Sequence, residues 1–262
     1  MYKNGCIRFE LTDYRPPLTE ALHVGDLFRK STFAALGAIY KYGDIPEKYS
    51  GKEAGTLYRS SSHDHAYFLP EPDLTSGEIQ YLSLYSPSGF EPVELLALSG
   101  INRLWSSSFP EIALEPCTVD PMIESMLFRS ARQWISLTPF LLSRHPRIRR
   151  SERRSRSQYN DALKRELRRS AVSHLEGLRV GEEVEIEIDW SLRSCLPGRC
   201  LKWSEFKRTR FGTDHQAAVR YGHGLKLTFS NPVRGPIAIG YASHMGLGLF
   251  IPREVIEEVK DP

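Results

Sequence analysis

The first half of the chain alternates between segments with strand-like and helix-like patterns of apolar positions. Partial alternation over 5–14 predicts a strand, and apolar residues on one face of 21–37 predict a helix. A second helix is predicted for 92–105, where Pro92 suits the first turn and apolar residues recur at helical spacing. Further strands are predicted at 65–70, 79–85 and 111–119, and Pro116 favours an edge position for the last of them.

This order of elements, β-α-β-β-α-β, is the ferredoxin-like arrangement. In that arrangement two helices cover one face of an antiparallel sheet. The other face is left available for a ligand or for a second domain.

The second half carries a less regular pattern. Its predicted elements are a strand at 133–143 that bends near Pro139, a helix at 159–175, a strand at 184–190, and strands at 200–211 and 225–229. The strand at 184–190 alternates apolar residues with acidic ones, which is typical of a half-buried strand. We therefore expect an α+β protein of two tandem ferredoxin-like units, at residues 1–125 and 126–262.

Composition narrows the class of protein. The 262 residues are 40% hydrophobic and 26% charged, which excludes a disordered chain. No run of 18 apolar residues occurs, and the N-terminus has no apolar signal core. Four cysteines at this length do not indicate a disulfide framework. These features favour a cytoplasmic protein without a membrane partner.

The charge of the chain is distributed unevenly. Residues 144–169 hold 11 Lys or Arg against 3 Asp or Glu, whereas the rest of the chain holds 24 against 29. A strongly basic segment on an otherwise slightly acidic protein indicates a polyanionic partner, with nucleic acid first. The alternative explanation, a solvated basic loop and helix, is about equally good for a charge run alone.

Arginine rather than lysine dominates the basic segment, with seven arginines between 144 and 156. Arginine makes bidentate contacts with phosphates and stacks on exposed bases, so this preference favours RNA or DNA. Five of these arginines are the candidate RNA-binding residues: Arg144, Arg147, Arg149, Arg150 and Arg153.

A glycine-rich stretch, GPIAIGYASHMGLGLF, occupies residues 235–250. Glycines permit a close approach of the backbone, so the stretch could present N–H donors to a phosphate backbone. On this hypothesis His244, Gly246 and Gly248 are further RNA-binding candidates. The alternative is a tight corner between strands in which the glycines only relieve steric clashes.

His63 and His65 are two residues apart at the entrance of a predicted strand, so their side chains share one side. Two such imidazoles can serve as general base and general acid near neutral pH. They could also begin a metal site, but no third ligand with convincing spacing follows. Ordinary surface or core histidines are the third explanation.

These segments together resemble a known family. The stretches SSSHDHAYFLPEPD, IQYLSLYSPSGF, RQWISLTPFLLSRHPR and GPIAIGYASHMGLGLF are similar to the CRISPR-associated RAMP superfamily. The likeness is strongest to the crRNA-processing half of the fused backbone/processing subunit of type I-U (I-G) systems, and it runs from about residue 12 to residue 252.

The resemblance implies an endoribonuclease that cuts CRISPR repeat RNA without a metal or other cofactor. In that chemistry the 2′-hydroxyl attacks the adjacent phosphate and leaves a 2′,3′-cyclic phosphate and a 5′-hydroxyl. The resemblance also implies a catalytic histidine near the connection from the first helix to the second strand, and this histidine would be His65 or His63. Tyr58 is then a supporting proton donor or orienter, Lys52 stabilises the phosphorane, and His23 and His244 are reserves.

The expected partners are CRISPR repeat RNA or crRNA and other subunits of a type I interference complex. Two alternatives stay open. The first is a crRNA-binding subunit without catalytic activity, which would use the arginines but not the histidines. The second is a metal-dependent hydrolase that uses the two histidines as ligands.

Overall fold

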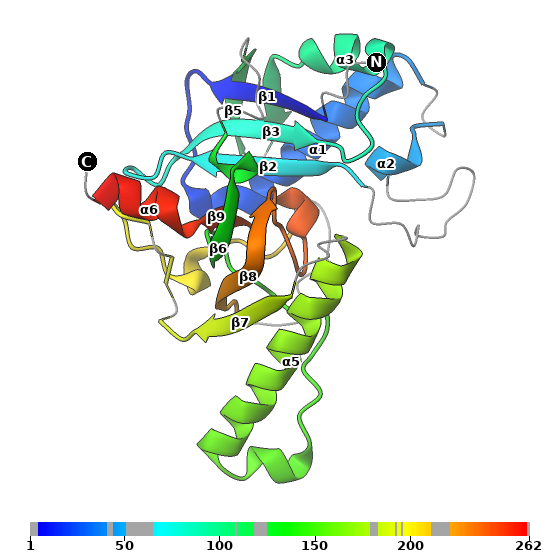
Figure 1. The fold of residues 1–262 in the computed structure, drawn as a ribbon. Coiled ribbons are helices and arrows are strands. Elements are labelled where there is room, and N and C mark those ends of the chain that lie inside the picture. The colour runs from blue at the N-terminus through cyan, green and yellow to red at the C-terminus, as the bar shows by residue number, and fades with distance from the viewer. Residues whose placement is uncertain are drawn as a thin grey trace.

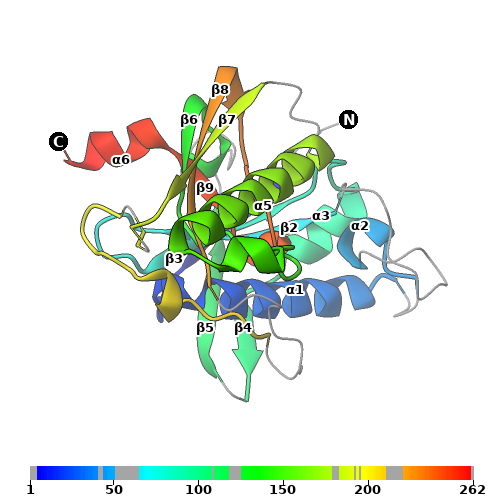
Figure 2. The same cartoon turned by 90° about the horizontal axis from the view of Figure 1, so that it is seen from below.

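A computed structural model gives the structure of the protein (Figure 1). It describes residues 5–40, 44–50, 65–107, 109–117, 125–178, 183–191, 193–194, 196–210 and 221–260. Among these residues, no helix combines the length and the apolar character needed to cross a bilayer. Figure 2 shows the two long helices, α1 and α5, as separate helices that each belong to one half of the molecule.

The first half forms an antiparallel sheet with the strand order β2-β3-β1-β5-β4. Its strands are β1 (Cys6–Leu11), β2 (Tyr67–Pro72), β3 (Ile79–Tyr85), β4 (Arg103–Ser106) and β5 (Phe109–Pro116). The helices of this half are α1 (Ala21–Gly37), the short α2 (Glu47–Ser50) and α3 (Pro92–Ser99), and α1 follows a 3-10 turn at Leu18–Glu20. Without β4, the order is that of a ferredoxin-like sheet.

Apolar side chains between the sheet and α1 form the core of the first half. The rings of Phe9 on β1 and Phe68 on β2 both meet Phe28 of α1 edge to face, with centroids 5.5 Å and 5.8 Å away. All three rings are almost fully buried. This packing explains why the helix predicted at 21–37 forms, because its apolar face covers the sheet.

The second half forms another antiparallel sheet, with the order β7-β8-β6-β9. Its strands are β6 (Ser130–Ser136), β7 (Val184–Asp189), β8 (Gly224–Arg234) and β9 (Phe250–Pro252). Helix α5 (Arg156–Gly177) lies between β6 and β7 in the chain, and α6 (Arg253–Lys260) follows β9. In place of a second helix between β8 and β9, the chain has the glycine-rich loop with a 3-10 turn, η5 (Ser243–Met245). The α+β fold with two ferredoxin-like units is confirmed.

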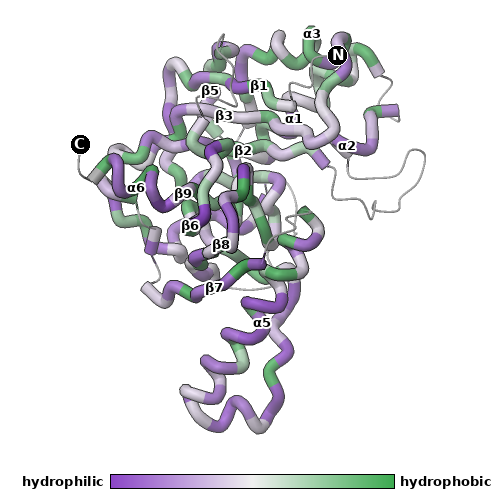
Figure 3. The backbone as a smooth tube through the Cα atoms, viewed as in Figure 1, coloured by the Kyte–Doolittle hydropathy of each residue, from purple (hydrophilic) through white to green (hydrophobic). Residues whose placement is uncertain are grey.

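Helix α5 packs on the second sheet through one stripe of side chains, and its N-terminal half projects away from the body of the molecule (Figure 1). The projecting part and the segment before it are strongly hydrophilic (Figure 3). This segment includes the 3-10 turn η3 (Arg150–Arg153). The buried stripe consists of Ala162, Leu163, Leu167, Ala171 and Leu175.

The glycine-rich loop packs against the first half of the molecule. A Cβ atom at Gly25 of α1 would lie 2.5 Å from the carbonyl oxygen of Met245, so only glycine allows η5 to come this close. A Cβ atom at Gly246 would lie 2.6 Å from the Pro70 ring on β2. Met245 and Leu247 consequently belong to the same core cluster as the residues around α1.

The helix predicted at 92–105 is correct only in its first part. Helix α3 ends at Ser99 with Gly100 as its C-cap, and the chain then forms β4, which pairs with β5. Leu96, which fits the helical repeat, is 79% exposed, whereas Leu104 is buried as a residue of β4. The apolar repeat therefore did not mark a buried helix face.

Two other predictions are wrong. Pro116 does not mark an edge, because β5 lies between β1 and β4, and Pro116 stands at its very end opposite Phe9. No strand forms over the described part of 200–211, which contains the 3-10 turn η4 (Trp203–Glu205). Its apolar residues pack instead on the core of the first half, and the Lys207 backbone N–H donates to the Thr19 carbonyl oxygen at 2.9 Å.

Candidate functional site

His65 stands directly before β2, where the backbone is held from two sides. The Ala66 N–H donates to the Lys48 carbonyl oxygen of α2 at 2.6 Å. The Lys48 ammonium in turn donates to the buried carboxylate of Glu94 on α3 at 2.6 Å and to the Gly89 carbonyl oxygen at 3.0 Å. The entrance of β2 is therefore fixed relative to both α2 and α3.

His244 reaches this entrance from the glycine-rich loop of the second half. Its ring lies edge to face with the His65 ring, with centroids 5.6 Å apart. It also stacks on Tyr67, the first residue of β2, at a centroid distance of 4.2 Å and an interplanar angle of 23°. The two histidines come from different halves of the chain and meet at the boundary between them.

The hydrogen bonding of His244 determines which of its nitrogens carries the proton. Its Nδ1 lies 3.3 Å from the carbonyl oxygen of Ala66, and a carbonyl oxygen can only accept. Nδ1 is therefore the donor, and in the neutral ring Nε2 carries the lone pair. A half-buried imidazole in this tautomer has the form that a general base needs.

The Nδ1 atom of His65 is buried and has no hydrogen-bond partner within the described part of the chain. Its ring is half-buried and packs beside that of His244. Two imidazoles at this separation can divide the work of proton removal and proton donation. The arrangement is thus capable of general acid–base chemistry.

Three candidates from the sequence, Lys52, Tyr58 and His63, lie outside the described residues. Their predicted roles stay predictions. Across the described ranges, no group of three or more His, Cys, Asp or Glu residues could hold a metal ion.

The candidate RNA-binding arginines all lie exposed on the segment before α5. The nearby carboxylate of Glu152 is occupied by other groups. It accepts from the Arg149 backbone N–H at 2.8 Å and pairs with the Arg165 guanidinium. Within the described part of the chain, no ion pair forms to any of the five guanidinium groups: Arg144, Arg147, Arg149, Arg150 and Arg153. Their positive charge is therefore available to a partner.

A short stretch of backbone connects the arginines to the histidine pair. The Tyr241 N–H of the glycine-rich loop donates to the Leu141 carbonyl oxygen at 2.8 Å, and Arg144 follows three residues after Leu141. On the other side of His244, Thr138 Oγ1 donates to the Gly246 carbonyl oxygen at 2.8 Å. The start of the basic segment and the loop that carries His244 are therefore held side by side.

The two candidate glycines of the loop are buried in the protein. Gly246 and Gly248 both have positive φ angles, of 90° and 59°. A Cβ atom at Gly248 would lie 1.8 Å from the Ile239 carbonyl oxygen, so no other residue fits. These contacts account for the glycines by sterics within the protein, which was the alternative to a direct approach of RNA.

His23, a reserve candidate, has protein partners at both ring nitrogens. Nδ1 lies 2.7 Å from the Glu20 carboxylate and Nε2 lies 2.9 Å from the Thr209 carbonyl oxygen. These contacts hold the segment around Thr209 against the start of α1. They account for His23 without a role in catalysis.

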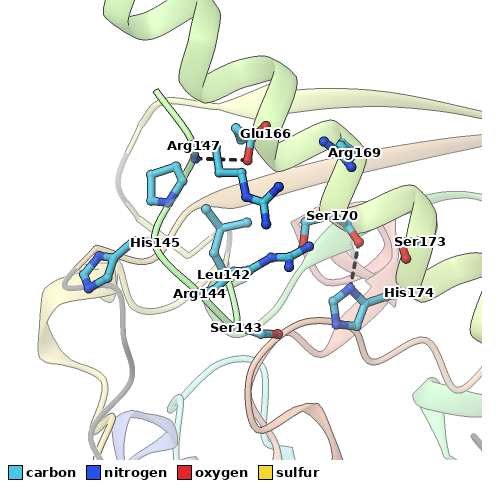
Figure 4. Close-up of a pocket in the computed structure, with 11 residues that line it drawn as sticks. Leu142, Ser143, Arg144, His145, Arg147, Glu166, Arg169, Ser170, Ser173 and His174 are labelled. Carbon is cyan, nitrogen blue, oxygen red and sulfur yellow. Dashed lines mark hydrogen bonds between the residues drawn. The ribbon is translucent and has the colours of Figure 1, made fainter. Parts of the chain in front are cut away.

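Sequence reasoning missed the part that α5 contributes. Arg169, Ser170, Ser173 and His174 line a cavity together with Arg144 and Arg147 (Figure 4). Their spacing places them on one stripe of the helix, which is a signal that the sequence does contain. The contact between His65 and His244 was missed because no local pattern links residues so far apart in the chain.

No protein-family profile matches the chain, and no curated protein sequence matches it significantly. The fold is similar to that of the crystal structure of Cas6b, with a TM-score of 0.50 at 10% identity, covering 94% of this chain and 98% of that chain. The crystal structure of a CRISPR RNA processing endoribonuclease, Cas6b, has a TM-score of 0.41 at 10% identity, covering 94% and 97%. A CRISPR associated protein, Cas6, has a TM-score of 0.44 at 11% identity, also covering 94% and 97%. At these identities the likeness concerns the fold.

Proposed function

We propose that this protein binds CRISPR repeat RNA and cleaves it, with His65 and His244 as the acid–base pair. The observation that carries the proposal is the contact of the two imidazole rings, 5.6 Å apart at the boundary between the two halves. The basic segment begins beside the same loop, and its five candidate arginines have no ion-pair partner among the described residues. The similarity of the fold to Cas6b supports the choice of CRISPR RNA as the substrate.

In the proposed reaction one imidazole removes the proton from a 2′-hydroxyl. The 2′-oxygen then forms a bond to the adjacent phosphorus, and the bond from phosphorus to the 5′-oxygen breaks. The second imidazole donates a proton to that leaving oxygen. The products are a 2′,3′-cyclic phosphate and a 5′-hydroxyl, and the atoms balance without a metal ion or water.

The tautomer of His244 supports its assignment as the base, because Nδ1 is the donor to Ala66 and Nε2 carries the lone pair. His65 is then the acid in this scheme. His63, Tyr58 and Lys52 belong to the connection just before His65, and we propose that they complete the site. The further assignment to a type I-U processing subunit, acting in the cytoplasm with other subunits of an interference complex, rests on the resemblance in sequence.

The test is a cleavage assay with a CRISPR repeat RNA, with and without EDTA. We expect the same rate in both, and no cleavage when the 2′-hydroxyl at the cut site is replaced by hydrogen. Cleavage of the deoxy substrate would contradict the mechanism, and loss of cleavage in EDTA would favour a metal-dependent hydrolase. Tight binding of the RNA without any cleavage would identify a crRNA-binding subunit instead.

A further inference from the structure

A cavity of about 370 Å³ lies between the start of the basic segment and the C-terminal half of α5 (Figure 4). One wall is the chain from Leu142 to Arg147, and the other is a stripe of α5 from Glu166 to His174. The volume is within the range typical of small-molecule sites. It is suited to a ligand of the size of one nucleotide.

Positive charge converges on this cavity. Arg144, Arg147 and Arg169 direct their guanidinium groups toward the same space in Figure 4. The acidic residue of the lining is Glu166, whose Oε2 accepts from the Arg147 backbone N–H at 3.1 Å. Three like charges that face one space repel each other unless an anion lies between them, and arginine is suited to bidentate contact with phosphate.

At His174 the cavity carries an acceptor that suits a base rather than a phosphate. His174 Nδ1 lies 2.7 Å from the Ser170 carbonyl oxygen, so Nδ1 is the donor and Nε2 of the neutral ring is an acceptor. The hydroxyls of Ser170, Ser173 and Ser143 also line the cavity, and Leu142 adds an apolar side chain. The ionised phosphodiester of an RNA chain has no hydrogen to donate to the imidazole acceptor, whereas every nucleobase has an N–H group.

We propose that this cavity binds one unpaired nucleotide of the RNA, with its phosphate between the three arginines and its base on the His174 side. The proposal deepens the proposed function, because it rests on RNA as the partner of the basic segment. A second cavity, of about 680 Å³, continues from it along Arg149, Arg153 and Arg165, and it offers a path for the neighbouring phosphates. The bound nucleotide would fix the position of the RNA relative to the nearby histidine pair.

The test measures binding of small probes to the full chain by ligand-detected NMR. The probes are the nucleoside 5′-monophosphates, ribose 5-phosphate and inorganic phosphate. We expect at least one nucleotide to bind about fivefold more tightly than ribose 5-phosphate, the gain of roughly one hydrogen bond to the base. His174→Phe, which keeps the ring volume, should remove this difference and leave ribose 5-phosphate binding unchanged.

Arg144→Ala should weaken all phosphate-containing probes. Arg154→Ala is the matched control, because Arg154 is exposed on the same segment, lines neither cavity and is not one of the five candidate RNA-binding arginines. Equal affinity for nucleotides and ribose 5-phosphate would overturn the proposal and leave a simple anion site. Nucleotide binding that is unaffected by Arg144→Ala would also overturn it. Since no cleavage is measured, failure of the proposed nuclease activity would leave this result intact and be recognised separately.

Discussion

His65 and His244 lie edge to face, with ring centroids 5.6 Å apart, although one stands before the second strand of the chain and the other before its last. His244 is tied to the backbone beside His65 through its hydrogen bond to Ala66. The contact therefore depends on the packing of the glycine-rich loop against β2. A pair built in this way should act as a unit in catalysis.

We predict that His65→Ala and His244→Ala each lower the single-turnover rate of RNA cleavage by about 10²–10⁴-fold. The double variant should lose much less than the product of the two single losses, because an acid and a base of one step are not independent. RNA affinity should stay nearly unchanged, since the arginines supply most of the binding energy. Cleavage kinetics and a filter-binding assay measure the two quantities.

Glu254→Ala is the control for these variants, because Glu254 is exposed on α6, outside the segments that carry the two histidines. Fully multiplicative losses in the double variant would indicate that the histidines act in separate steps. A parental rate for both single variants would remove the pair from the mechanism and leave His63 as the remaining candidate.

The basic segment should dominate the salt dependence of RNA binding. Replacing Arg147, Arg149, Arg150 and Arg153 with alanine should flatten the plot of log K against log salt concentration. Each lost phosphate contact removes about 0.7–0.9 from the slope. The measurement is a titration of RNA binding between low and high salt. Arg132→Ala with Lys202→Ala, which removes exposed charges outside the segment, should change the slope little. An unchanged slope in the quadruple variant would place the RNA elsewhere.

Gly248→Ala should destabilise the protein rather than weaken RNA binding directly. The new Cβ atom would lie 1.8 Å from the Ile239 carbonyl oxygen, at a φ of 59°. We expect a loss of about 3–5 kcal/mol, from backbone strain and overpacking together. Gly89→Ala is the matched control: its φ is 78°, but a Cβ atom there has nothing within 4 Å, so strain alone should cost about 1 kcal/mol.

Thermal unfolding distinguishes the two glycine variants. The midpoint temperature should fall by about 2–4 °C for each kcal/mol of lost stability in a chain of this size. The folded fraction of Gly248→Ala should bind RNA as the parent does. Unchanged stability with a lower RNA affinity would instead indicate that the backbone at Gly248 contacts the RNA.

The stability of the folded protein should decrease as the pH is lowered, because of His223. This side chain is 6% exposed, and burial lowers its pKa from 6.5 to about 4. Between these values the unfolded chain binds a proton that the folded chain does not, so stability is full above pH 6.5 and is lost as the pH falls toward 4. The contribution is about 3 kcal/mol over that window.

Urea unfolding at pH 7, 5.5 and 4.5 measures this effect. His223→Gln should flatten the pH dependence within the window, whereas His145→Gln, at an exposed position, should leave it as in the parent. The same slope in the parent and in His223→Gln would assign the effect to other groups.

The sequence was informative wherever one local pattern decided the structure. The helix at 21–37 has the predicted bounds, since its apolar face covers a sheet. The segment 184–190, where apolar and acidic residues alternate, corresponds to β7 (Val184–Asp189). The failures have a common physical cause. Leu104 and Phe206 are buried beside elements distant in the chain, because β4 packs on α1 and the Lys207 backbone next to Phe206 bonds to Thr19. Periodicity carries no information about such partners.

The candidate site was predictable residue by residue but not as an arrangement. His65 and His244 are both recognisable in the sequence, one in a His-x-His pair and the other among glycines, yet their patterns suggested separate roles. Their contact depends on Gly25 and Gly246, whose missing side chains let the two halves approach. A helical glycine such as Gly25 is unfavourable by about 1 kcal/mol relative to alanine, which is a sign that a close neighbour exists.

The glycine-rich loop also determines when, during synthesis, the site can exist. Met245 and Leu247 complete the core around α1, although they are translated long after α1 itself. A nascent chain that ends before the loop lacks both His244 and the apolar residues that cover this part of the first half. The histidine pair can therefore assemble only after the glycine-rich loop has been translated. A growing chain attached to the ribosome, where RNA surrounds it, carries the arginines before it carries the complete histidine pair.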